Sequence, residues 1–506
     1  MNDKKKAERS LIIVSNRLPI VLRKKADDSW TIAPGSGGLV TALAPVLKNR
    51  GGVWIGWPGN VMDEEFDLEK LLREQGKTLG YQLKSVSLTR KEKENYYQGF
   101  ANEVLWPLFH DFMAHCNFKP DYWEVYQQVN NKFAQVTHRN LSKDSFVWVH
   151  DYHLIGLASS LRGMGVQNKL AFFLHIPFPP PDIFIRLPWR FEILNALLDY
   201  DLVGLQTIRD RRNFLQCVRR FVQDVNINGS GQVMRILRNG REIRVGVFPI
   251  SIDFKEFDHL ARTPEVDRKV AEIRKNYSDR KIIFGIDRMD YSKGIPERLR
   301  AFRYALRHYP ELKEKVTFVQ IMVPSRREIT RYANLKIEIE RLVGEINGQF
   351  TQPGWVPVHY MFTTLNREQL VAYYRASDIA LLTPLKDGMN LIAKEFCAAN
   401  VEEKGILILS EFAGAAAQFQ QHAILVNPHD IVETATAIKN AYDMSLKKID
   451  RPIKKLRQNV KKFDIFWWVD SFLLAAIEKN LDSFPRMDDY IPQAEDESFK
   501  GMPDEI

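Results

Sequence analysis

Residues 281–300, KIIFGIDRMDYSKGIPERLR, decide the fold. The first six residues are apolar enough for a buried parallel strand, and Pro296 suits the first turn of a helix. The loop between them carries Arg288 and Lys293. Ligands of open parallel sheets bind beyond the carboxyl ends of the strands, where helix amino termini favour negative charge. The segment therefore predicts a phosphate or diphosphate site, with a solvated basic loop as the alternative.

Similar strand-like runs alternate with helical patterns along the whole chain, as doubly wound α/β domains require. A chain of 506 residues exceeds one compact core, so we expect two such domains, residues 1–255 and 256–465, facing each other across a cleft. Pro249 ends the last strand of the first domain, and a charged helical stretch leads to the next strand. The expected strands are 11–15, 53–57, 146–150, 170–176, 202–206, 245–250, 282–286, 316–322, 379–383 and 406–409.

Composition narrows the class of protein. The net charge is +9, but the basic residues are spread along the chain, which favours small anionic substrates at least as well as nucleic acid. No apolar run reaches membrane-spanning length and no signal-peptide pattern is present, so we expect a cytoplasmic protein. Three scattered cysteines fit reduced thiols, and the acidic, proline-containing tail 484–506 is expected to be mobile.

A second strand-to-helix turn, residues 381–396, LLTPLKDGMNLIAKEF, is the partner of the first. Asp387 and Gly388 make the turn, and residues 389–391 begin a helix with free backbone N–H groups. Glu395 is suited to accept hydrogen bonds from a ribose and Asp387 from a sugar. The alternative is that acids simply complement the helix dipole, which explains Asp387 better than Glu395.

Gly35 to Gly38 precede a helical pattern and allow the backbone to approach a phosphate or sugar closely. As a dinucleotide fingerprint the segment is poor, because Val40 occupies the third glycine position, and a tight turn is the alternative.

Tyr97 and Trp106 lie among other aromatic residues. Such residues are usually core, although sugar sites also use aromatic faces.

Polar residues follow two further strands. His150, Asp151 and His153 follow one, and His175 ends the next. Their spacing does not match helical metal-ligand pairs, so we expect no metal; Asp151 is suited to accept and His175 to donate hydrogen bonds to substrate hydroxyls. Arg326 follows the strand at 316–322 and suits a second anionic group. Together these sites suggest a nucleotide sugar and a phosphorylated acceptor.

These segments together resemble the trehalose-6-phosphate synthases, retaining glycosyltransferases of the GT-B fold that join glucose from UDP-glucose to glucose 6-phosphate. The resemblance runs from Leu11 to about Leu481. It rests on VSNRLPI, SGGL, GVWIGWPG, YYQGFANEVLWPLFH, VWVHDYHLI, FFLHIPFP, DRMDYSKGIPER, VPSRREI, RLVGEINGQF, LKDGMNLIAKEF and LILSEFAGAA, in that order.

The resemblance implies roles for particular residues and needs no cofactor. It implies that the first domain binds the acceptor, that the second binds the nucleotide sugar, and that 466–483 crosses back to the first domain. The implied catalytic residues are Arg288, Lys293, Asp387 and His175. The implied donor-binding residues are Gly37, Gly38, Arg288, Lys293, Leu365, Asp387, Gly388, Met389, Asn390, Leu391 and Glu395. The implied acceptor-binding residues are Arg17, Tyr97, Trp106, Asp151 and Arg326.

Two alternatives stay open. The segment LPWR at 187–190 resembles the related glucosylglycerol-phosphate synthases, so a sister enzyme using glycerol 3-phosphate is one of them. A non-catalytic homologue that binds sugar phosphates and regulates a partner is the other. No phosphatase domain fits after residue 481, so we expect a separate phosphatase to act on the product; we also expect a homo-oligomer, with no nucleic-acid or membrane partner.

Overall fold

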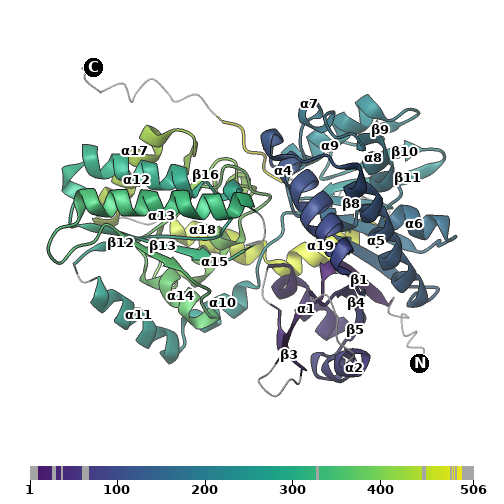
Figure 1. Cartoon of the computed structure of the whole chain (residues 1–506), viewed down its shortest axis with the longest axis horizontal. Helices are drawn as coiled ribbons and strands as arrows, with labels where there is room; N and C mark the ends of the chain where they lie inside the picture. Colours follow the sequence, from purple (N-terminus) through teal and green to yellow (C-terminus); the bar gives the residue numbers. More distant parts are fainter. Residues whose placement is uncertain are drawn as a thin grey trace.

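The computed structural model describes residues 10–24, 30–35, 38–59, 68–277, 279–325, 330–446, 452–478, 481, 484 and 487–492. Two sheets lie side by side, each with helices on both faces (Figure 1). This confirms the predicted α/β class with two doubly wound sheets. Among the described residues, none of the helices is both long enough and apolar enough to cross a membrane.

The first sheet has nine strands in the order β5-β4-β1-β6-β7-β8-β11-β10-β9. All neighbours pair in parallel except β11 with β10 and β10 with β9. The central strands are buried on both faces, as their unbroken apolar runs predict. The bounds are β1 (Leu11–Arg17), β4 (Val53–Trp57), β5 (Gln82–Ser85), β6 (Phe146–His150), β7 (Lys169–Phe173), β8 (Leu202–Leu205), β9 (Asn226–Asn228), β10 (Val233–Arg238) and β11 (Arg241–Val247).

Helices of several lengths flank this sheet, and a small antiparallel hairpin, β2 (Ile20–Lys24) with β3 (Trp30–Pro34), lies beside it. The principal helices are α1 (Gly38–Arg50), α2 (Leu68–Leu79), α5 (Pro120–Arg139), α6 (Leu157–Gly163), α8 (Arg190–Leu198) and α9 (Ile208–Phe221).

The second sheet has six parallel strands in the order β14-β13-β12-β15-β16-β17. Its strands are β12 (Lys281–Arg288), β13 (Val316–Val323), β14 (Val358–Phe362), β15 (Ile379–Leu382), β16 (Ile406–Ser410) and β17 (Ile424–Val426). Its helices include α10 (Phe254–Ala261), α11 (Pro264–Asn276), α12 (Ile295–His308), α13 (Thr330–Phe350), α14 (Arg367–Ala376), α15 (Leu391–Ala399), α17 (Ile431–Leu446) and α18 (Ile453–Lys462).

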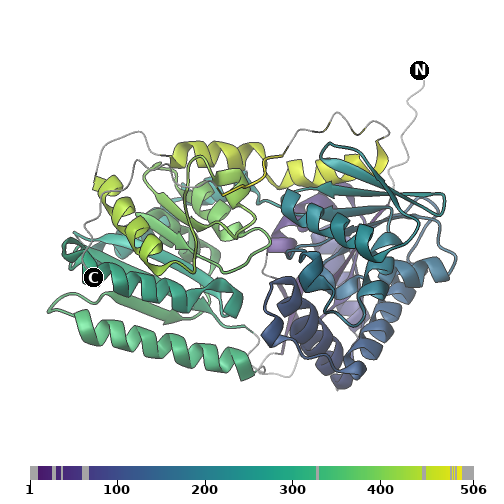
Figure 2. The same cartoon turned by 90° about the horizontal axis from the view of Figure 1, so that it is seen from above.

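The last helix, α19 (Ile465–Ile477), returns to the first sheet (Figures 1 and 2). Phe472 stacks on Trp148 with ring centroids 4.3 Å apart. The Arg244 guanidinium on β11 donates to the carbonyl oxygens of Ala475 and Glu478, at 2.7 Å each. Aromatic packing and these two hydrogen bonds therefore fasten the end of the chain to the half in which it began.

The segment 487–492 also contacts both halves. Asp489 lies 3.6 Å from the Arg212 guanidinium on α9, and its carbonyl accepts a hydrogen bond from the Gln420 side chain at 3.3 Å. The hydroxyl of Tyr490 donates to Glu411, at the end of β16, at 2.9 Å. The rest of the tail that we expected to be mobile lies outside the described residues, apart from Phe484.

All ten predicted strands exist, but two of them end three residues earlier than predicted. The strand expected at 170–176 ends at Phe173, so His175 lies two residues beyond it. The strand expected at 245–250 ends at Val247, two residues before Pro249, which has no N–H to donate to a neighbouring strand. The edge strands β5, β9, β14 and β17 were not predicted, and neither was β10, which lies next to β9.

Candidate active site

An ion pair joins the two strand-to-helix turns of the second sheet. The Lys293 ammonium, in the short helix η4 (Tyr291–Lys293), lies 2.7 Å from Oδ2 of Asp387. The same oxygen accepts a hydrogen bond from the Asn390 side-chain amide at 3.2 Å. The two side chains of the pair are only 11% and 16% exposed, so water screens their attraction weakly.

Opposing effects set the charge of Asp387. Burial acts to raise the pKa of this carboxyl, but the Lys293 ammonium lowers it more strongly, helped by His110 and Arg288. The net result is a pKa below the ordinary value. Asp387 is therefore ionised at neutral pH.

A buried arginine holds the strand ends together beneath this pair. Arg298 on α12 has a fully buried side chain. Its guanidinium donates to Asp287, to Oγ1 of Thr383 at 3.0 Å and to Oε1 of Gln320 at 3.1 Å. A further N–H reaches the carbonyl of Lys293 at 3.3 Å. The loop that carries Lys293 is thus attached to residues in or directly after the three neighbouring strands β12, β13 and β15.

Backbone contacts fix the two turns against each other. The carbonyl of Ser292 accepts from the N–H of Leu385 at 2.8 Å. Gly294 has φ 62°, and a Cβ there would lie 2.4 Å from the carbonyl oxygen of Thr383. Only glycine fits this position, because a side chain would meet both strain and a backbone atom.

Helix α15 begins at the second turn. Asn390 adopts φ 75°, and its side-chain oxygen accepts from the N–H of Ala393 at 3.0 Å, so it caps the helix. Glu395 lies one turn further on and accepts a hydrogen bond from the Tyr374 hydroxyl at 2.7 Å. Burial raises the pKa of Glu395. One carboxylate oxygen is thus fixed by Tyr374, which orients the other.

The first sheet contributes a pair of histidines. Nε2 of His175 lies 3.1 Å from Nδ1 of His150, and the His175 N–H donates to Oδ1 of Asp151 at 3.3 Å. Burial lowers the pKa of His175 to about 3 and that of His150 well below its ordinary value. Both imidazoles are therefore neutral near pH 7, and one donates to the other.

Arg17 and Tyr97 meet at a tryptophan that we did not predict. The Arg17 guanidinium lies 4.6 Å from the ring centroid of Trp57, and the Tyr97 ring meets the same indole edge to face at 5.8 Å. Tyr97 also stacks on His153 at 5.9 Å. Tyr97 belongs to a π-helix, η1 (Lys93–Leu105), that leads directly to Trp106.

Trp106 lies between the two halves of the molecule. The Arg288 guanidinium is 6.0 Å from its ring centroid, at the outer limit of a cation–π contact. Nδ1–H of His110 donates to the Trp106 carbonyl at 2.7 Å, and the two rings lie 4.1 Å apart. Burial lowers the pKa of His110 to about 4, so this ring is also neutral near pH 7.

The two halves touch at Gly388. A Cβ on this residue would lie 2.1 Å from the carbonyl oxygen of His175. Beside it, the Lys386 ammonium forms an ion pair with Asp111 at 2.6 Å. The turn of the second sheet that carries Asp387 therefore lies directly against the His175 segment of the first.

The predicted site residues divide into three groups. Those brought together where the halves meet are Trp106, Asp151, His175, Arg288, Lys293, Asp387, Gly388 and Asn390, while Arg17 and Tyr97 meet at Trp57 and Glu395 lies one turn along α15. Three predicted donor-binding residues have apolar side chains that pack into the core: Met389 is 3% exposed, and Leu365 and Leu391 are partly buried. These residues therefore offer a ligand mainly their backbone groups. Gly38 is the first residue of α1, whereas Gly37 and Arg326 lie outside the described residues.

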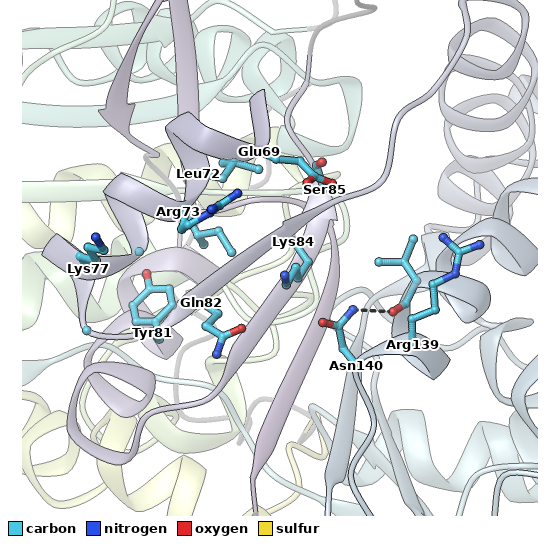
Figure 3. A pocket seen from close by; sticks show the side chains of 14 residues that line it. Glu69, Leu72, Arg73, Lys77, Tyr81, Gln82, Lys84, Ser85, Arg139 and Asn140 are labelled. Carbon is cyan, nitrogen blue, oxygen red and sulfur yellow. Dashed lines mark hydrogen bonds between the residues drawn. The ribbon is translucent and has the colours of Figure 1, made fainter. Parts of the chain in front are cut away.

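A large hollow elsewhere contains none of the predicted site residues. It has a volume of about 730 Å³ and lies at the outer edge of the first sheet, between α2, the edge strand β5 and the end of α5 (Figure 3). Arg73, Lys77, Lys84 and Arg139 line it. The candidate active site therefore rests on the meeting of strand ends and not on cavity size.

Sequence reasoning missed three residues of the site. Trp57 ends β4, next to β1 and Arg17, so the rule that polar and aromatic groups at neighbouring strand ends converge predicts it. His110 follows Trp106 by four residues, which is helical spacing. Tyr374 reaches Glu395 from α14, and no local pattern indicates that contact.

Two Rossmann-like sheets whose strand ends face each other around such a site define the GT-B class of glycosyltransferases. Residues 9–478 match the model of glycosyltransferase family 20, and the chain belongs to that family.

Trehalose-6-phosphate synthase of Mycobacterium tuberculosis H37Rv is 41% identical over 470 residues, which are 91% of this chain and 93% of the relative. An α,α-trehalose-phosphate synthase (UDP-forming) from Burkholderia xenovorans, in complex with glucose-6-phosphate, matches with a TM-score of 0.82 and 34% identity over 92% of this chain and 99% of that one. The trehalose-6-phosphate structure from E. coli bound with UDP-2-fluoro glucose matches with a TM-score of 0.83 and 35% identity, over 93% and 99% of the two chains.

Proposed function

We propose that this protein transfers glucose from UDP-glucose to glucose 6-phosphate with retention of configuration, giving α,α-trehalose 6-phosphate and UDP. The observation that carries the proposal is the meeting at Gly388 of the cationic turn of the second sheet with the His175 segment of the first. The relatives support both substrates, since one is bound to glucose-6-phosphate and another to UDP-2-fluoro glucose.

The donor occupies the second half in this proposal. Arg288 and Lys293 bind its diphosphate, and the exposed backbone N–H groups at the start of α15 assist them. Glu395, oriented by Tyr374, accepts hydrogen bonds from the ribose. Asp387 accepts from a glucose hydroxyl, which its ionised state at neutral pH favours.

The acceptor occupies the first half. Arg17 lies over Trp57 and supplies charge for the phosphate of glucose 6-phosphate, while Tyr97 and Asp151 offer a hydroxyl and a carboxylate to the sugar. Trp106 offers its face to the sugars. Neutral His175 contacts hydroxyls without adding charge.

Positioning and electrostatics carry the reaction. The bond between C1 of the donor glucose and the β-phosphate oxygen breaks, and a bond forms between that carbon and the acceptor's anomeric oxygen on the same face. The acceptor hydroxyl gives its proton to the leaving β-phosphate oxygen. Arg288 and Lys293 stabilise the negative charge that develops on UDP.

The proposal also covers the location of the enzyme, its oligomeric state and the fate of its product. We infer a cytoplasmic homo-oligomer whose product is dephosphorylated by a separate phosphatase.

The test is an assay of purified protein with UDP-, ADP- and GDP-glucose against glucose 6-phosphate and glycerol 3-phosphate, with products identified by mass and NMR. We expect α,α-trehalose 6-phosphate from UDP-glucose and glucose 6-phosphate. Preference for glycerol 3-phosphate would identify the sister activity. Release of UDP that does not depend on an acceptor would refute the proposal.

A further inference from the structure

The backbone of a single residue in the connection between the two halves is bound by both of them. After β11 the chain runs through residues 248–253 to α10. In this connection the N–H of Ile250 donates to Oε1 of Gln206, which follows β8 of the first sheet, at 2.9 Å. The carbonyl of Ile250 accepts from the ammonium of Lys394, on α15 of the second half, at 2.8 Å. Ile250 is thus the shared partner of one side chain from each half.

Gln206 and Lys394 also lie next to residues of the candidate active site. Gln206 uses its amide to donate to the carbonyl of His175 at 3.4 Å, the same carbonyl that lies against Gly388. Lys394 directly precedes Glu395 on α15. Gln206 and Lys394 are each 1% exposed, so neither contacts a ligand itself. Any effect they have on the reaction passes through His175 and through α15.

Burial of the Lys394 side chain is unfavourable in free energy. It forms no ion pair with any residue that the structure describes, and its hydrogen bond to Ile250 is its one polar contact among those residues. It is the fourth residue of α15, near the positive end of that helix, where the dipole opposes a cation. Burial lowers the pKa of Lys394 to about 7. An apolar residue of similar length would pack there without this cost.

We propose that Gln206 and Lys394 are positioning residues that together fix the backbone of Ile250 and so set the placement of His175 relative to the start of α15. Transfer between two substrates held by different halves depends on that placement, and small errors of alignment are costly to rate. Binding of UDP, whose diphosphate and ribose we place against residues of the second half, does not depend on that placement. This inference rests on the proposed function.

The first test compares Lys394→Met and Gln206→Met with the wild type, and uses the exposed Lys461→Met on α18 as the matched control. We expect kcat with both substrates to fall by about 10- to 100-fold in Lys394→Met and in Gln206→Met, with the Kd for UDP alone unchanged within about twofold by calorimetry. A kcat within twofold of the wild type would overturn the inference. A parallel loss of UDP affinity would also overturn it, because Lys394 would then only shape its own helix.

The second test is the double variant, Gln206→Met with Lys394→Met. Because both side chains act through the backbone of the same residue, we expect the kcat of the double variant to equal that of the less active single variant. A loss equal to the product of the two single losses would show independent roles and overturn the inference. The wild-type product assay judges the proposed function separately, since an active wild type with unaffected variants rejects only the positioning role.

Discussion

Lys293 and Asp387, 94 residues apart in the sequence, form a 2.7 Å ion pair at the point where two neighbouring strands of the second sheet end. The pair explains how a carboxylate and a cation share the turn to which we assign the donor diphosphate. The ammonium keeps the buried Asp387 carboxyl ionised, and the carboxylate holds Lys293 close enough to His110 for its charge to act on that ring. A diphosphate that approaches this turn meets a cation that is already positioned.

Arg288 is the less constrained cation of the turn, and its loss should be the cleaner test of leaving-group stabilisation. We expect Arg288→Ala to lower kcat by about two or three orders of magnitude, since such preorganised donors typically contribute a few kcal/mol each. The control is Arg300→Ala on α12, which removes a surface ion pair with Glu338 instead. Near-normal turnover of Arg288→Ala would remove this residue from the mechanism.

Breaking the Lys293–Asp387 pair should destabilise the fold as well as the site. Lys293→Met leaves a largely buried carboxylate without its cation, which typically costs about 3 kcal/mol or more, and thermal unfolding should report it as a lower Tm. The double variant Lys293→Met with Asp387→Asn removes the orphaned charge. We expect it to regain most of the lost Tm while staying inactive, and a double variant as unstable as the single one would contradict this account.

Tyr374 should matter for the donor although it lies behind Glu395. Its hydroxyl fixes one oxygen of that carboxylate, and a lost hydrogen bond to a charged group costs about 1.5 kcal/mol or more. We therefore expect Tyr374→Phe to weaken UDP binding by about tenfold in calorimetry. The neighbouring Tyr373→Phe is the control, because that ring stacks on Phe284 and does not reach Glu395. Equal affinities in the two variants would show that Tyr374 does not orient the carboxylate.

Arg17 should affect the acceptor alone. Removal of its guanidinium from the face of Trp57 takes away the charge that we assign to the sugar phosphate. We expect Arg17→Ala to raise KM for glucose 6-phosphate at least about tenfold and to leave the Kd for UDP unchanged. Arg73→Ala, in the hollow at the edge of the first sheet, supplies a control of the same chemistry. A similar rise in both variants would point to a general charge effect.

The fold was predictable because the buried strands are recognisable in the sequence as short apolar runs. Phe146–His150 and Val53–Trp57 are apolar runs flanked by polar segments, and the structure places strands at those residues. Edge strands such as β5 carry polar residues, since one side of each faces solvent, and they offer no such signal. The end of β7 was misplaced because Leu174 and Ile176 are buried outside the strand, and burial alone does not separate strand from coil.

The site was predictable where its residues lie at or just after the end of a strand that the sequence itself indicates, as Arg288, Lys293 and Asp387 do. It was not predictable where contacts join segments distant in the chain. The hydrogen bond of Tyr374 to Glu395 and the binding of the Ile250 backbone by Gln206 and Lys394 depend on how helices pack on the sheets. A π-helix before Trp106 likewise has no simple periodic signature.

The buried histidines predict that the protein loses stability in acid. His110 has a pKa of about 4 in the folded protein, against an ordinary value of 6.5. As the pH falls through 6.5 the unfolded chain gains a proton that the folded chain takes up only near pH 4. The free energy of unfolding therefore decreases across this window, by up to about 1.4 kcal/mol per pH unit for this one residue.

His110→Asn isolates that contribution. The asparagine amide is able to donate to the Trp106 carbonyl as the imidazole does, but it does not titrate. We expect Tm to fall less steeply between pH 6.5 and 5 in this variant than in the wild type, with the exposed His259→Asn on α10 behaving like the wild type. Parallel curves for wild type and His110→Asn would mean that His110 is protonated in the folded state over this range, and the neutral ring that we place beside Trp106 and Asp387 would then be wrong.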